Sequence, residues 1–212
     1  MKIQFIAIAV AVAGVAAIAQ DRMVHSHFTK SPIVIREMGT DTMMIIDKWM
    51  PEPKKVAMKM IDKYGQPNEA TKHRLIWWDN GPWKYSILEN VEIPHDFPMP
   101  HKDMLRQVIN YKVMPDKVDD LSSYDGSVIF DRTPGELSAR CDKEEANFLA
   151  INLAHDVVTG KRSVKDARKF YAMTIKASMA MTATSEQKEY MMGLTFKQPM
   201  MMTNAPDTPY RE

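Results

Sequence analysis

The sequence predicts an α+β fold in which helices pack on an antiparallel sheet. Two hairpin signals, each a turn between β-favouring segments, predict the strands: residues 74–88 and 127–141. Three stretches with apolar residues at helical spacing predict the packing helices: near 54–64, 142–159 and 163–181. Strands and helices do not alternate regularly along the chain, which favours antiparallel pairing over a doubly wound fold.

The first helix and the first hairpin have clear boundaries. The helix follows Pro51-Glu52-Pro53, which suits a helix start, and precedes Gly65-Gln66-Pro67, which suits a helix stop. The hairpin has an aromatic first arm at residues 74–78, turn residues at 79–82 and an alternating second arm at 83–88. An isolated hairpin is marginally stable, so we expect the preceding helix to cover one of its faces.

Residues 94–101 form a proline-rich segment in the middle of the chain. Pro94, Pro98 and Pro100 exclude a regular helix or a central strand there. The segment is predicted to be an ordered loop or a joint between two subdomains. Beyond it, residues 108–113 suit a strand, and residues 115–124 suit a short helix that begins at its proline.

The helix near 142–159 has a wide apolar arc and one polar stripe. Asp142 and Glu145 have the spacing of a capping box at its start. The stripe contains Glu145, Asn152, Asp156 and Thr159, with His155 at its edge. We expect this stripe to face solvent, with the lining of a pocket as the alternative.

Composition excludes several classes of protein. The 212 residues are 45% hydrophobic and 26% charged, so the chain is not wholly disordered. Its net charge of +1 does not indicate a nucleic-acid-binding protein. The single cysteine, Cys141, excludes an intrachain disulfide and a multi-cysteine zinc site, and we expect it to be buried.

The N-terminus has the pattern of a secretory signal peptide. Lys2 precedes an apolar run, and Ala17-Ile18-Ala19 is a small-x-small cleavage site. We therefore expect an exported protein, periplasmic or secreted, with residues 1–19 removed and no membrane span afterwards. The mature chain divides into a single α+β domain at 20–181 and a Met-rich, largely irregular tail at 182–212.

Several strings in the sequence resemble a family of uncharacterised exported bacterial proteins. They are KYGQPNEAT, GPWK, IPHDFPMPHKDML, YDGSVI, ARCDKEEANFLAINLAHD and VTGKRSV, and together they fall within residues 53–175. The resemblance implies a periplasmic or secreted bacterial setting. It implies no particular activity, cofactor or ligand.

Candidate site residues centre on the proline-rich segment. Two imidazoles on a stiff loop are able to present metal ligands at low entropic cost. The candidate ligand-binding residues are His95, Asp96, His101, Asn152 and His155. The candidate metal ligands are His95, His101, Cys141 and His155, a mixed nitrogen and sulfur set that suits zinc or copper. Methionines number 19, and the cluster at 200–202 is a further candidate for Cu(I), although methionine more often fills a core.

No recognisable catalytic constellation is present. The sequence lacks a Gly-rich phosphate loop, a G-x-S-x-G elbow, an H-E-x-x-H pair and a C-x-x-C-H haem motif. The leading hypothesis is therefore a non-enzymatic protein that binds a small ligand or a protein partner through the surface around 94–101. Two alternatives stay open: a copper or zinc protein that uses the His95/His101 loop, and a hydrolase-like enzyme with His101 or His155 as base.

Overall fold

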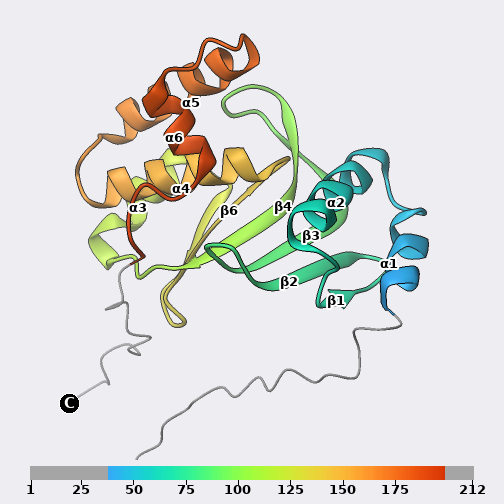
Figure 1. Cartoon of the computed structure of the whole chain (residues 1–212). Helices are drawn as coiled ribbons and strands as arrows, with labels where there is room; N and C mark the ends of the chain where they lie inside the picture. The colour runs from blue at the N-terminus through green and yellow to red at the C-terminus, as the bar shows by residue number, and fades with distance from the viewer. Residues whose placement is uncertain (1–37, 199–212) are drawn as a thin grey trace, which may run out of the picture. The chain divides into compact units, whose positions relative to one another are not determined.

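A six-stranded antiparallel sheet organises the computed structural model, which describes residues 38–198 (Figure 1). The strand order across the sheet is β1-β2-β3-β4-β6-β5. The strands are β1 (Glu69–Ala70), β2 (Arg74–Asn80), β3 (Trp83–His95), β4 (His101–Asn110), β5 (Val128–Asp131) and β6 (Glu136–Cys141). The predicted α+β class with an antiparallel sheet is confirmed.

Helices pack against one face of this sheet, either directly or through one another. They are α1 (Met38–Ile46), α2 (Pro51–Tyr64), the 3-10 turn η1 (Pro115–Lys117), α3 (Val118–Tyr124), α4 (Glu144–Val158), α5 (Val164–Met179) and α6 (Ser185–Met192). Within the described residues, no helix combines the length and the apolar character that crossing a membrane requires. The predicted signal peptide, residues 1–19, lies outside the described residues.

The alternation of side chains along the strands explains why one face is covered. Leu88 pairs with Leu105, and both are fully buried beneath α2. Further along the same face, Ile109 pairs with Leu137 beneath α4. Each fully buried side chain of this size contributes about 1.5–3 kcal/mol. The opposite face carries side chains that stay partly exposed, such as Trp78, Tyr85 and Arg106.

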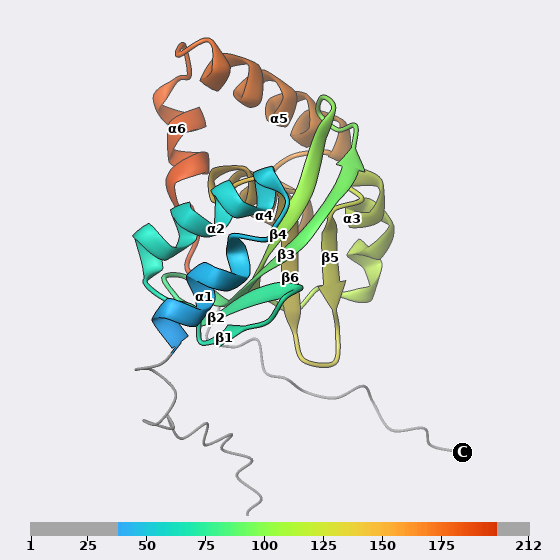
Figure 2. The ribbon, with the colours of Figure 1, turned by 90° about the vertical axis from the view of Figure 1, so that its right-hand side faces the viewer.

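The proline-rich segment is the end of a hairpin in the sheet. β3 continues through Pro94 to His95, Pro94 pairs with Lys102, and His95 pairs with His101. A proline is tolerated there because it lies at the end of the strand ladder. Residues 96–100 connect the two strands, and Figure 2 shows the β3–β4 arm reaching toward α5. The sheet is therefore continuous across the expected joint.

The chain after residue 181 is more regular than its sequence indicates. The expectation of an irregular tail is wrong for Ser185–Met192, which forms α6. Thr184 and Gln187 form a capping box at its start, and Tyr190 and Met191 are buried against the core. Residues 199–212, including the methionine cluster at 200–202, lie outside the described residues.

Helix α6 also changes the environment of the polar stripe on α4. Asn152 and Asp156 are buried, so the solvent-facing expectation is wrong for both. The Asn152 amide donates to the carbonyls of Tyr190 and Gly193, and Asp156 accepts hydrogen bonds from Arg162 and Tyr190. Asn152 and Asp156 of the stripe therefore form part of the surface on which α6 packs. α4 itself begins at Glu144, directly after its N-cap residue Lys143, and no side chain caps it, so the expected cap from Asp142 is absent.

Candidate metal centre

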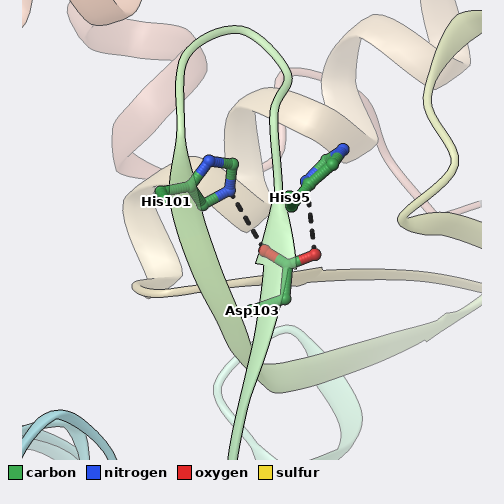
Figure 3. Close-up of side chains that lie close together, drawn as sticks. All are labelled: His95, His101 and Asp103. Carbon is green, nitrogen blue, oxygen red and sulfur yellow. Dashed lines mark ion pairs between the residues drawn. The ribbon is translucent and has the colours of Figure 1, made fainter.

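The β3–β4 hairpin brings two histidines together at its end. His95 and His101 are register partners, and their ring centroids lie 4.9 Å apart. Asp103 follows His101 by two residues in β4, so it projects from the same face of the strand. Its carboxylate lies between the two imidazoles, with Oδ2 3.3 Å from His95 Nδ1 and Oδ1 3.1 Å from His101 Nε2 (Figure 3).

Both imidazoles are oriented by groups on the side away from Asp103. His101 Nδ1 lies 2.9 Å from the carbonyl oxygen of Met99. His95 Nε2 lies 3.5 Å from Asp125 Oδ1, and the backbone N–H of Ser127 donates to the same carboxylate oxygen. Outer partners of this kind fix the tautomer and ring orientation of metal-binding histidines.

The cluster combines two buried carboxylates with two half-buried rings. Asp103 is 2% exposed and Asp125 is 4% exposed. Burial raises the pKa of Asp125, because desolvation disfavours its charged form. The adjacent Asp103 carboxylate, followed by the Cys141 sulfur, raises the pKa of His101 to about 11. His101 therefore carries a second ring proton at neutral pH in the metal-free protein, and a metal ion that binds its Nε2 would displace that proton.

One oxygen of this cluster lacks a hydrogen bond. Asp103 Oδ1 is buried and receives no well-aligned hydrogen bond from the described residues, although His101 Nε2 is only 3.1 Å away. The other oxygen, Oδ2, accepts a hydrogen bond from the Ser127 hydroxyl. A buried carboxylate oxygen needs a donor or a cation beside it, and in the metal-free protein the protonated His101 ring supplies the positive charge.

Ser127 does not have the geometry of an activated nucleophile. Its Oγ is 3.3 Å from His95 Nδ1, and Asp125 lies beyond that ring, which superficially matches a Ser-His-Asp arrangement. However, the hydroxyl has a second acceptor in Asp103 Oδ2, which competes with the imidazole for its single proton. A serine activated by a histidine base must give its proton to that base.

Cys141 lies at the edge of the cluster. It ends β6, pairs with Leu105 of β4 and places its Sγ 3.4 Å from His101 Nε2. As expected from the sequence, the side chain is buried, at 5% exposure. Burial raises the pKa of the thiol, which keeps it protonated and poorly nucleophilic at neutral pH.

Alkylation of Cys141 should therefore be slow in the native protein. We expect iodoacetamide to modify the thiol many times faster after unfolding in guanidinium chloride than in buffer. Mass spectrometry measures both rates without ambiguity, since the sequence has a single cysteine. Equal rates in the two states would contradict the buried position of the side chain.

The remaining predicted site residues lie apart from this cluster. Asp96 is exposed in the connection between β3 and β4. His155 Nδ1 lies 2.8 Å from the Tyr111 hydroxyl, and its ring stacks on Phe196 with centroids 4.0 Å apart. Burial lowers the pKa of His155 and so favours its neutral form. Asn152 holds the backbone after α6. The structure thus brings together His95, His101 and Cys141.

Asp103, Asp125 and Ser127 were not among the residues predicted from the sequence. Asp103 had a usable signal, because a His-x-Asp spacing within a strand places both side chains on one face. Asp125 and Ser127 lie in the turn between α3 and β5, and they reach the hairpin only through the folding of the sheet. No local pattern connects them with His95.

Comparison with known proteins adds no relative. No family model matches the chain, and neither a curated protein nor a solved structure does. The fold and the site define it as an α+β protein with a His-His-Asp cluster at the end of a β-hairpin.

Proposed function

We propose that this protein binds a divalent transition metal ion, zinc above all, through His95, His101 and Asp103. The observation that carries the proposal is the convergence of their ligand atoms, one from each residue, within 4.8 Å of one another. Two imidazoles and one carboxylate form a common ligand set for zinc. Small rotations of the side chains would bring the atoms to the zinc–ligand distances of about 2.0–2.2 Å.

The tautomer of His101 supports a cation at this position. Its Nδ1 faces the Met99 carbonyl, an acceptor, so Nδ1 must carry a proton. In the neutral ring, Nε2 then carries a lone pair and is an acceptor. It faces another acceptor, Asp103 Oδ1. Two acceptors at 3.1 Å need a positive charge between or beside them. A second ring proton meets this need in the metal-free protein, and a zinc ion would meet it for both imidazoles at once.

The charge of the cluster supports a divalent ion. Asp103 and Asp125 are both buried, and two buried carboxylates need compensation. A 2+ ion together with two neutral imidazoles would balance them. In this arrangement Asp125 would act on the metal through His95, as an outer carboxylate that orients the ring.

A zinc titration tests the proposal. We expect the wild-type protein to take up one zinc ion in competition with a chromophoric chelator. His101→Gln should weaken this binding by about a hundredfold or more, because even outer-shell substitutions cost about 10–100-fold. His73→Gln is the matched control, since His73 is exposed in the turn before β2. Equal zinc affinity in the wild-type and His101→Gln proteins would contradict the proposal.

A further inference from the structure

A small pocket adjoins the candidate metal centre. It has a volume of about 210 Å³ and lies between the end of the β3–β4 hairpin, the start of α4 and the second half of α5. His101 and Cys141 form the wall that it shares with the cluster. Met99, Tyr171 and Met179 belong to its apolar wall, and Asp142 and Lys143 are charged residues of its lining.

We propose that this pocket binds a small, mainly apolar carboxylate whose head group completes the coordination of the metal. The inference rests on the proposed function, because it needs a metal at His95, His101 and Asp103. Three protein ligands leave one position open in a tetrahedral zinc site. Of the three proposed ligands only His101 lines the pocket, so a head group there would reach the metal past the His101 ring and the Cys141 sulfur, which lies 3.4 Å from His101 Nε2.

The walls of the pocket define the chemistry of this ligand. Asp142 also lines the pocket, 3.8 Å from the Lys143 ammonium group, so the two side-chain charges offset each other and the attraction for an anionic head comes mainly from the metal. Most of the other lining residues are apolar, which favours an aliphatic or aromatic tail. The volume of about 210 Å³ is below the range of about 300–1,000 Å³ that is usual for pockets of drug-sized ligands, so the ligand must be small. The expected ligand is therefore about the size of pentanoate.

A chain-length series tests both the head and the tail of the ligand. Isothermal titration of the zinc-loaded protein with acetate, propionate, butyrate, pentanoate and octanoate should show affinity rising about fourfold per CH₂ group. The rise should end near pentanoate, where the pocket is full. Pentanol, which lacks the anionic head, should bind more weakly than pentanoate, and the metal-free protein should bind pentanoate more weakly than the zinc-loaded one.

A pair of substitutions on α5 tests the location. Met179→Glu places a negative charge at the rim of the pocket, and Met179 is 68% exposed, so the variant should fold. We expect it to weaken pentanoate binding at least tenfold and to leave zinc affinity unchanged. Met173→Glu is the matched control, because Met173 is 54% exposed on the same helix and is not part of the pocket wall.

The outcomes separate this inference from the function on which it rests. If the wild-type protein binds no zinc, both the proposed function and the inference are overturned. Normal zinc binding without a chain-length dependence, or equal effects of the two α5 substitutions, would overturn the inference alone. Pentanoate binding that appears only in Cys141→Ser would also overturn it, since the thiol would then occupy the fourth position itself.

Discussion

Replacing Glu144 with alanine is expected to lower the free energy of unfolding by about 3–5 kcal/mol. Glu144 is 7% exposed at the start of α4. Its Oε1 accepts hydrogen bonds from Tyr64 at 2.5 Å, Trp83 at 2.6 Å and Gln107 at 3.1 Å. These bonds connect α2, β3 and β4 to α4, so alanine would leave donors unpaired on three elements. Each buried donor left without a partner costs about 1–3 kcal/mol.

The charge of Glu144 gives this prediction a pH dependence. Burial by itself would raise the pKa of Glu144, but hydrogen bonds from Lys63, Tyr64, Trp83 and Gln107 outweigh burial and lower it. A carboxylate with a lowered pKa contributes stability above its unfolded value of 4.5. That contribution is lost as the pH falls through the folded pKa. The difference in free energy of unfolding between the wild-type protein and Glu144→Ala should therefore become smaller in acid.

Urea unfolding of the two proteins at pH 7 and in acid measures both effects. Glu145→Ala is the matched control, because Glu145 is the next residue of α4 and is exposed. We expect it to change stability by less than about 0.5 kcal/mol. A loss of under 1 kcal/mol in Glu144→Ala would show that the buried carboxylate does not hold the helices to the sheet.

Replacing Asp103 with asparagine is expected to reduce zinc affinity by about a hundredfold or more. The substitution preserves shape but removes the negative charge between His95 and His101. It also leaves two neutral imidazoles as the only remaining ligands of the proposed site. Because asparagine still offers an oxygen to the Ser127 hydroxyl, we expect the fold to be retained.

Competition with a chelator measures the affinity, and circular dichroism checks the fold. Asp96→Asn removes the same charge from an exposed position on the same hairpin and should leave zinc affinity within about threefold of wild type, a difference of about 0.6 kcal/mol. Similar affinities for Asp103→Asn and Asp96→Asn would mean that long-range attraction, and not coordination, holds the ion.

The histidine pair could be anticipated from the sequence because proline limits the conformations of the chain around it. Pro94, Pro98 and Pro100 indicated a stiff segment with His95 and His101 at its ends. They also misled, since a segment with three prolines was not expected to contain strand residues. Pro94 fits into β3 because it lies in one of the last pairs of the β3–β4 ladder, where a missing N–H is tolerated.

The parts that could not be anticipated depend on long-range packing. The polar stripe of α4 has the period of an exposed face, and only the docking of α6 makes Asn152 and Asp156 buried. Asp125 reaches His95 from another part of the chain, in the turn before β5. A single sequence carries periodicity and turn chemistry, but not the pairing of segments that are far apart.

Anomalous scattering at the zinc absorption edge, measured from crystals of the zinc-loaded protein, tests the central claim most directly. We expect one strong peak between His95 Nδ1, His101 Nε2 and the Asp103 carboxylate, at about 2.0–2.2 Å from each. This peak should be missing from crystals of His101→Gln grown in the same zinc concentration. A wild-type protein whose zinc peaks lie only at surface residues, with this cluster empty, would contradict the account.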